Sequence, residues 1–458
     1  MIRQNNYSIG FLLLLILLAT TAFRGFAVER IYNKDPAAVL ANDSARYLQP
    51  VNGRNRGNLC TLIPSERIDE LPQVAPLYSW VLCGLDNLTE DVIFSALMLQ
   101  IFLGACTILL VFLTTKLILG KNDVALFSAA LFALDPLQNY YSAMILSETL
   151  FTFLVTLSTL IGVKLALTNG RNKTLFWSVA FGLALGTTVL ARQVTYYIVF
   201  PVVLGFIFYS FFAKHSSRQS FTSVLLISAS FAFVVGTWQI RNGIATGTYA
   251  FSNNAPTVIL EWKAAGLKAH QENISREDAI DILEKDFPIY PYLSKKDLMK
   301  EQTRVGINYL INNKVDYLTW SAGGIAKMLG GPGSTGARKW IQLITDNNHE
   351  VTSTENTKIE NNPLHDTIHL AVTSSTILYT ILLYILLVGG VLLIRPLNTA
   401  QKAALLLTIG IGMYLILISS GHIGAHYSRF RVPAMPLFCI AAAIGFQLII
   451  IHYKNRRF

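Results

Sequence analysis

Long runs of apolar residues are the feature that most restricts how this chain can fold. A helix needs about 20 such residues to cross the hydrocarbon core of a bilayer, and the 458-residue sequence contains ten runs near that length. We expect spans at residues 8–23, 92–115, 124–138, 141–163, 174–191, 195–213, 221–239, 367–394, 403–420 and 432–451. The third is the weakest, because Asp135 and Pro136 break a helix at its end. The sequence therefore predicts an all-α polytopic membrane protein.

The distribution of charge assigns the loops to the two sides of the membrane. Only 14% of the residues are charged and the formal net charge is +10. If the N-terminus is cytoplasmic, the short inner segments hold thirteen lysines and arginines and a single acid, Asp123. This asymmetry follows the positive-inside rule, so the basic balance indicates topology and not nucleic-acid binding. Both termini are expected in the cytoplasm. A cleavable signal peptide is the alternative for the first run, but nine remaining spans would then place the basic C-terminus outside.

Two expected outer segments are long, whereas every inner loop is short. In the first, residues 24–91, the Pro-rich part indicates a turn and a short interfacial helix. In the second, Ser275 followed by Asp278 resembles a capping box, and residues 307–329 are amphipathic and expected along the membrane surface. We expect three parts, namely an N-terminal transmembrane module (1–240), an outer-face helical region (241–366) and a C-terminal three-span module (367–458).

Ionisable residues gather at the expected outer ends of six segments instead of at the bilayer midplane, where a transporter of a charged solute usually holds them. They are Asp43, Arg46, Asp135, Glu148, Arg192, Arg241, His422, His426, Arg429 and Arg431. An outer-face enzyme lacks cytosolic nucleotide sugars, but a polyprenyl-phosphate sugar is already activated there. Displacement at its anomeric carbon needs a base for the acceptor proton and cations for the departing phosphate. Asp43 is a candidate base, and arginines bind phosphate bidentately. In a helix, Arg46 and Tyr47 would share the face of Asp43.

The stretch "DSARY", residues 43–47, resembles the first-loop motif of GT-C fold glycosyltransferases that use polyprenyl-phosphate sugars. The pattern is similar to that of the lipid A aminoarabinose transferase and protein O-mannosyltransferase group, which has an Asp-Glu pair followed by Arg and Tyr. The stretches "LDPLQNYYSAMILSETLFTFL", "GLALGTTVLARQ", "TWQIRNGIATG" and "SRFRVPAMP" are similar in kind and in order. One position departs from the pattern, because Ser44 stands where the family has its second acid. Glu148 is the candidate to replace it from another helix.

The resemblance implies a GT-C-like fold of about ten transmembrane helices and an inverting transfer of a sugar to a lipid, glycan or protein acceptor on the outer face. We expect no cofactor and no metal. The expected roles are Asp43 and Glu148 as catalytic residues, Arg46, Arg192, Arg241, Arg429 and Arg431 as donor phosphate ligands, and Tyr47 and His426 as substrate contacts. A carrier or flippase of lipid-linked glycans would bind the same phosphate without forming a bond, and an inactive scaffold would need none of these residues.

Simpler interpretations stay open for most of these residues. Asp43 is also suited to cap a short helix, Glu148 to pair structurally with an arginine, and each arginine to reach the headgroups from a helix end. The glycine-rich stretch 329–338 indicates a flexible turn. Cys60 and Cys83 share the first outer segment, where a disulfide is as probable as two free thiols. A glycan on Asn42 would obstruct Asp43, which favours a bacterial inner membrane with the site on the periplasmic face.

Overall fold

The computed structural model describes residues 2–51, 71–212, 217–287, 294–333, 341, 344, 363–421 and 427–456, and these are helical or irregular, without any strand. Eight helices are long and apolar enough to cross a membrane, and two apolar helices are shorter. The eight are α1 (Ile2–Lys34), α4 (Val92–Leu119), α7 (Glu148–Leu167), α8 (Arg171–Ala191), α10 (Ser217–Thr246), α17 (Pro363–Leu392), α18 (Thr399–Ile418) and α19 (Met435–Arg456). The two shorter ones are α5 (Asn122–Ala133) and α9 (Val199–Phe212). The predicted all-α membrane protein is confirmed.

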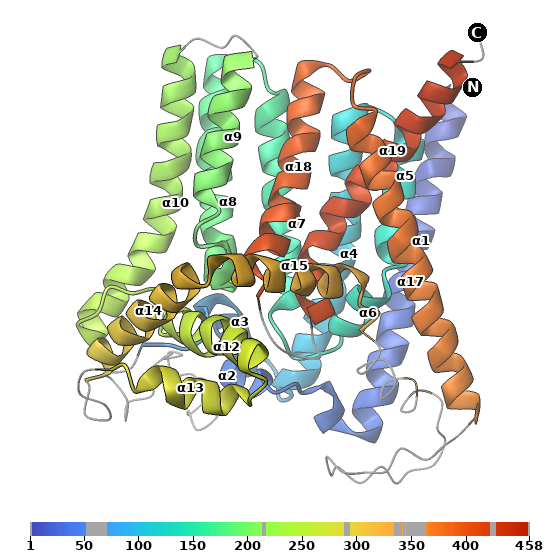
Figure 1. Ribbon diagram of the computed structural model, residues 1–458. Helices are drawn as coiled ribbons and strands as arrows, with labels where there is room; N and C mark the ends of the chain where they lie inside the picture. The colour runs from blue at the N-terminus through green and yellow to red at the C-terminus, as the bar shows by residue number, and fades with distance from the viewer. Residues whose placement is uncertain are drawn as a thin grey trace.

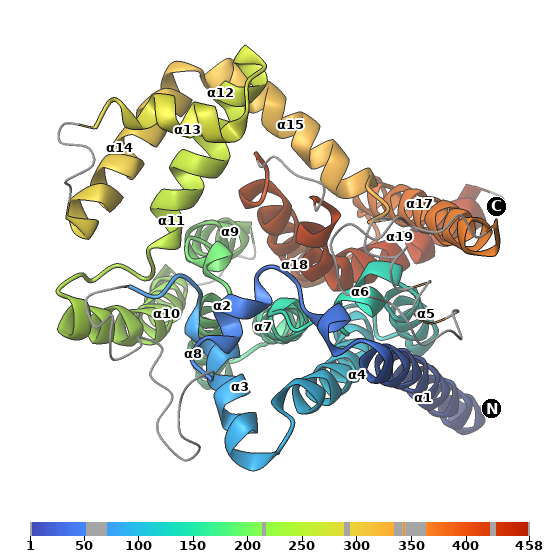
Figure 2. The same ribbon diagram turned by 90° about the horizontal axis from the view of Figure 1, so that it is seen from below.

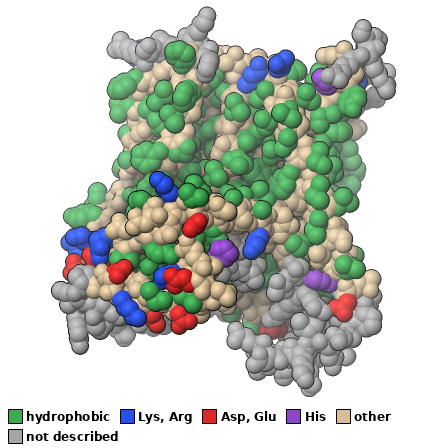
Figure 3. Space-filling model, in the orientation of Figure 1, with side chains coloured by type: hydrophobic (Ala, Val, Ile, Leu, Met, Phe, Trp, Pro, Cys, Tyr) green, Lys and Arg blue, Asp and Glu red, His purple; other side chains and the backbone are tan. Residues whose placement is uncertain are grey.

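The small elements lie together at one end of the bundle, opposite the two termini (Figure 1). From the first long segment come η1 (Pro36–Val39), α2 (Ser44–Leu48) and α3 (Pro76–Leu88). From the second come α11 (Asn254–Thr257), the π-helix η4 (Val258–Ala264), α12 (Ala265–Glu272), α13 (Arg276–Glu284), α14 (Lys295–Asn312) and α15 (Lys314–Gly330). Short pieces between the long helices are α6 (Pro136–Tyr141), η3 (Gln193–Thr195) and the 3₁₀ helix η5 (Tyr427–Ala434). Charged side chains on the viewed face concentrate at the same end (Figure 3).

Several helix boundaries differ from the predicted spans. The first helix was expected to end at residue 23 but runs to Lys34, and the seventh runs to Thr246 instead of ending at residue 239. The fourth was expected from residue 141, yet α7 begins only at Glu148. Its delay has a local cause, because Asp135 and Pro136 open the separate helix α6, with the Asp135 carboxylate accepting from the Gln138 N–H. Residues 142–147 that follow α6 are not helical.

The most enclosed helix is α19, which packs against α17 through glycines. Gly390 and Gly445 face each other at the crossing, where a Cβ on Gly445 would collide with the Leu386 carbonyl. Small residues let two helix backbones approach closely, and such contacts hold helices together within a bilayer. In the outer region, the side chain of Ser275 accepts from the Asp278 N–H at the start of α13, as the sequence predicted. Helix α15 lies across the ends of the long helices (Figure 1).

Candidate active site

Charged side chains from four separate parts of the chain meet around Arg429 at the end of the bundle opposite the termini. Arg429 Nη1 donates to Asp43 Oδ2 over 2.8 Å, and Arg429 Nε donates to Glu148 Oε1. Arg192 Nη1 lies 2.5 Å from the same Glu148 oxygen. We call Asp43, Glu148, Arg192 and Arg429 the ion cluster. Seen from the end of the bundle, α2 lies next to the ends of α7 and α8, which brings these residues together (Figure 2).

The ion cluster is closed at its base and open at its edge. The side chain of Glu148 is 0% exposed, that of Arg429 13%, that of Arg192 20% and that of Asp43 36%. Arg46 extends the cluster outward, since its side chain is 53% exposed and its Nη1 atom lies 3.6 Å from Asp43 Oδ1. Three arginines face two carboxylates, so the group carries one positive charge in excess. The arrangement suits a singly charged anion that arrives from the open side.

Asp43 holds its place without capping a helix. It occupies the N-cap position of α2, but its side chain makes no capping hydrogen bond, so the structure does not support the capping interpretation. Instead, the carboxylate is held by Arg429 from one side and Arg46 from the other. Asp43 is the accessible carboxylate of the cluster, because its side chain is 36% exposed whereas that of Glu148 is 0% exposed.

Glu148 is the first residue of α7 and lies deeper than Asp43. Its Oε1 atom contacts both arginines. Its Oε2 atom is buried and has no hydrogen-bond partner among the described residues. Replacement of the family's second acid by Glu148, which the sequence raised as a hypothesis, is consistent with its position beside Arg429. Glu148 Oε1 is thus the shared contact of Arg192 and Arg429.

Tyr47 is buried, at 7% exposure, whereas the side chain of the neighbouring Arg46 is 53% exposed. The Tyr47 hydroxyl forms a 2.8 Å hydrogen bond with Ser147 Oγ, and its ring meets Tyr78 edge to face at 5.1 Å. Burial raises the pKa of Tyr47 above its usual value, although Arg192 and Arg429 act in the opposite direction. Tyr47 therefore remains a neutral phenol beside the cluster.

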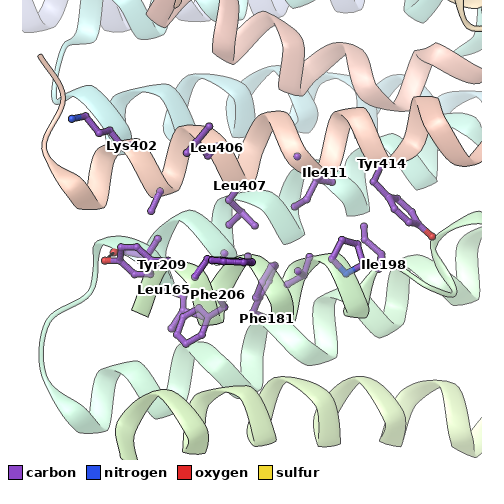
Figure 4. Close-up of a pocket in the computed structure, with 18 of the residues that line it drawn as sticks. Leu165, Phe181, Ile198, Phe206, Tyr209, Lys402, Leu406, Leu407, Ile411 and Tyr414 are labelled. Carbon is purple, nitrogen blue, oxygen red and sulfur yellow. Dashed lines mark hydrogen bonds between the residues drawn. The ribbon is translucent and has the colours of Figure 1, made fainter. Parts of the chain in front are cut away.

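An apolar groove in the bundle leads towards the ion cluster. It encloses about 650 Å³ between α7, α8, α9 and α18 and is lined largely by aliphatic and aromatic side chains. Lys402 and Tyr414 lie at its opposite ends (Figure 4). The Tyr414 hydroxyl donates to the Val194 carbonyl over 2.8 Å. Because Val194 is two residues after Arg192, one end of the groove adjoins the segment that supplies a cluster arginine.

Two arginines that the sequence assigned to the phosphate lie elsewhere. Arg241 is inside α10, where its guanidinium stacks on Trp238 with 5.0 Å to the ring centre. Arg431 is 1% exposed and donates to the carbonyls of Met328 and Leu329 near the end of α15. Neither arginine makes a hydrogen bond or ion pair with the ion cluster in the described part of the chain, so the structure gives no support to their predicted phosphate roles. Arg241 lies within a helix that was expected to end before it, and Arg431 faces a different side of η5 from Arg429.

Some predicted residues lie outside the part of the chain that the structure describes. These are His422, His426 and Cys60. Cys83 is disulfide-bonded, whereas Cys106 and Cys439 are free. Within the described ranges, no group of three or more His, Cys, Asp or Glu is arranged to hold a metal ion.

Several buried polar residues of this region were given no role from the sequence. Ser44 and Gln100 bind the backbone that precedes Glu148. Arg24, in α1, is 2% exposed and donates from Nε to Asn139 Oδ1 over 2.8 Å. A polar residue within or next to an apolar span is the available signal for Gln100 and Arg24, whereas the sequence marked Ser44 only as a departure from the family pattern.

Comparison with known proteins gives one family and a set of distant structures. The sequence model of the family described as dolichyl-phosphate-mannose-protein mannosyltransferase matches residues 70–240. No curated protein matches the chain. The apo oligosaccharyltransferase of Archaeoglobus fulgidus is 13% identical, with a TM-score of 0.51 over 97% of this chain and 51% of that one. The chain thus spans about half the length of that protein and shares its GT-C fold, as the sequence predicted.

Two further solved structures are more distant. The oligosaccharyltransferase AglB from Archaeoglobus fulgidus, in complex with an inhibitory peptide and a dolichol-phosphate, is 13% identical with a TM-score of 0.49 over 97% of this chain and 51% of that one. ArnT from Cupriavidus metallidurans bound to undecaprenyl phosphate is 13% identical, with a TM-score of 0.42 over 95% of this chain and 77% of that one.

Proposed function

We propose that this protein is a membrane glycosyltransferase that moves a sugar from a polyprenyl monophosphate to an acceptor hydroxyl or amine. The observation that carries the proposal is the bridging of two carboxylates by Arg429, with Asp43 at the open edge and Glu148 at the closed base. The match of residues 70–240 to dolichyl-phosphate-mannose-protein mannosyltransferases supports a sugar donor carried on a lipid phosphate.

Charge favours a monophosphate over a diphosphate linkage in the donor. A sugar linked to a polyprenyl monophosphate is a phosphodiester with one negative charge. Asp43, Glu148, Arg46, Arg192 and Arg429 together carry one positive charge, so this donor would bring the site to neutrality. Arg192, Arg429 and the exposed Arg46 would hold the phosphate oxygens, because guanidinium groups bind them in a bidentate manner.

The apolar groove is suited to the polyprenyl tail. It is lined largely by apolar side chains such as Leu407 and Phe206, and it begins near the segment that carries Arg192. A hydrocarbon chain placed there would lie within the bilayer while its phosphate reached the ion cluster. Burial of apolar surface would then contribute to affinity, and the arginines would set the position of the anomeric carbon.

In the proposed transfer, the exposed acid Asp43 acts on the acceptor, whereas the buried acid Glu148 holds the arginines. Asp43 would accept the proton of the acceptor hydroxyl or amine as the oxygen or nitrogen attacks the anomeric carbon. The bond between that carbon and the phosphate oxygen would break, and the electron pair would leave with the polyprenyl phosphate. Attack opposite the leaving group inverts the anomeric centre. The arginines would stabilise the charge that develops on the phosphate, and Glu148 would keep Arg192 and Arg429 aligned.

The charge distribution supports an orientation with the ion cluster on the outer face. Both ends of the described chain lie opposite the cluster (Figure 1), and the basic inner segments predicted from the sequence belong to that opposite end. In a bacterium the site would face the periplasm, across the inner membrane from nucleotide sugars. Lipid, glycan and protein acceptors are all compatible with an open edge at Asp43.

The proposal is tested with purified protein in liposomes and a panel of radiolabelled polyprenyl-phosphate sugars, with and without envelope extract as the acceptor source. We expect release of free polyprenyl phosphate by the wild type, and a loss of about 10²- to 10⁴-fold in Asp43→Asn. Asp281→Asn, which changes an exposed acid on α13, is the matched control and should release product at the wild-type rate. Binding of donor without release across the panel would favour a carrier. Equal release by Asp43→Asn would remove Asp43 as the base.

A further inference from the structure

The segment that positions Glu148 is irregular backbone at the end of the bundle. Residues 142–147 leave α6 and enter α7 at Glu148. Irregular backbone near the membrane must have its polar groups satisfied by other parts of the protein. Local backbone hydrogen bonds, such as that from the Ser142 N–H to the Gln138 carbonyl, satisfy part of this segment. Its longer-range hydrogen bonds come from the first outer segment and from α4.

Ser44 provides the contact from the first outer segment. Its Oγ donates to the Ile145 carbonyl over 2.7 Å and accepts from the Ala41 N–H over 2.9 Å. The Ile145 N–H donates to the Val39 carbonyl over 2.9 Å, and Ser44 itself is 1% exposed. The residue directly after Asp43 is thus tied to a residue three positions before Glu148.

Gln100 holds the same segment from the side of α4. Its Nε2 donates to the carbonyls of Ser142 and Met144, over 3.2 and 3.0 Å. Its Oε1 accepts from the Tyr78 hydroxyl over 3.0 Å. Gln100 is 1% exposed, so the segment is fixed on one side by α4, and Ser44 ties α2 to the other side.

We propose that Ser44 is a positioning residue that sets the separation between Asp43 and Glu148, so that one guanidinium, that of Arg429, reaches both. The expected effect of Ser44 on the reaction rate rests on the proposed function, whereas the hydrogen bonds of Ser44 do not. The hydroxyl is suited to the task because it donates to one backbone group and accepts from another at the same time.

A carboxylate at position 44 would fail although it would resemble an acid pair. It has no hydrogen to donate to the Ile145 carbonyl, and it would place a further, buried negative charge near Asp43 and Glu148. An unpaired charge in such a place is costly. An asparagine has nearly the same size and can donate from its amide nitrogen. Ser44→Asp and Ser44→Asn introduce side chains of similar size, but only the asparagine can donate a hydrogen bond and only the aspartate adds a charge. A difference between the two variants therefore reports on donor capacity and charge and not on size.

The rate experiment compares Ser44→Ala, Ser44→Asn and Ser44→Asp with the wild type, using kcat and the donor KM per mole of monodisperse protein. Misplacement of a reacting group by about 1 Å can cost on the order of 100-fold. We expect kcat to fall about tenfold in Ser44→Ala and on the order of 100-fold in Ser44→Asp, with Ser44→Asn the most active of the three. A Ser44→Asp variant as active as Ser44→Asn, or a fully active Ser44→Ala, would overturn the inference.

A stability experiment tests the same contact without relying on activity. The melting temperature is measured for wild type, Ser44→Ala, Glu148→Gln and the double variant. If Ser44 acts by placing Glu148, the loss of Tm caused by Ser44→Ala becomes smaller when Glu148 is already replaced. An equal loss in both backgrounds would contradict a positioning role. A wild type without transferase activity, combined with a coupled Tm loss, would refute the proposed function while keeping the positioning role of Ser44.

Discussion

Two groups of charged side chains at the same end of the bundle differ in how their charges are held. The ion cluster joins acids directly to arginines and opens outward at Asp43, which is 36% exposed. The second group, Arg24, Asp135 and Arg431, is sealed, since none of the three is more than 2% exposed. We call it the sealed group. It shows that a buried charge near a membrane surface need not belong to a reaction site.

The sealed group is held mainly by neutral partners. Arg24 donates to the side-chain oxygen of Asn139, and Arg431 donates to two backbone carbonyls of α15. Although these three residues are described, no ion pair within 4.0 Å joins Asp135 to either arginine. Burial raises the pKa of Asp135, against the opposing effects of the Gln138 N–H and of the two arginines. These contacts tie helices together, whereas the contacts of the ion cluster leave a carboxylate and a guanidinium available to a ligand.

The sharpest test of this difference is to neutralise one buried acid in the ion cluster and one in the sealed group. Glu148→Gln removes the shared anchor of Arg192 and Arg429, so we expect transfer to fall on the order of 10²- to 10³-fold. Asp135→Asn keeps an oxygen that can accept from the Gln138 N–H, and we expect transfer per folded protein within about threefold of wild type. Initial rates on monodisperse protein measure both. A comparable loss of activity in the two variants would abolish the distinction.

A second test concerns arginines that do and do not reach the ion cluster. Arg192→Gln should raise the donor KM about tenfold, because one charge-assisted contact to the phosphate is lost. Arg241→Gln is the matched control, since Arg241 stacks on Trp238 outside the cluster. Its donor KM should stay within about twofold of wild type. The KM values come from titrating the donor at saturating acceptor, and a larger change in Arg241→Gln would reassign the phosphate site.

A third test weakens the attachment of α15 to η5. Arg431→Met removes two hydrogen bonds to the end of α15, and we expect a stability loss of about 2 kcal/mol with a donor KM close to that of wild type. Thermal unfolding in detergent, followed by tryptophan fluorescence, measures the first quantity. A large rise in donor KM without loss of stability would mean that Arg431 contacts the phosphate after all.

The smallest effect is expected at Arg24. Its Nη1 and Nη2 atoms are buried and have no hydrogen-bond partner in the described ranges, so Arg24→Met should change stability by no more than about 1 kcal/mol. A Cβ added at Gly104 would collide with the Arg24 guanidinium. Gly104→Ala should therefore destabilise the wild type but be tolerated in Arg24→Met. Equal Tm losses in both backgrounds would show that Gly104 is required for another reason.

Much of this protein follows from the sequence alone, because the bilayer imposes strong rules on the chain. Each of the ten predicted spans overlaps a helix, although only eight of the described helices are long and apolar enough to cross a membrane. Asp43, Glu148, Arg192 and Arg429 were all named as candidates, because charged residues at the ends of apolar helices are few and conspicuous. Apolar length and charge are local properties, so they can be read along the chain.

The tertiary structure decided which of these residues meet and which do not. Asp43 and Arg429 are 386 positions apart, and their pairing depends on how α2, α7 and η5 pack. Arg429 and Arg431 lie two residues apart in one motif, yet in a 3₁₀ helix with three residues per turn they face different sides. One therefore enters the ion cluster and the other binds α15. Ser44 looked like a missing acid in the sequence, whereas its role as a hydrogen-bond donor depends on a carbonyl 101 positions away. Pairings of this kind are set by packing between distant segments, which no local pattern encodes.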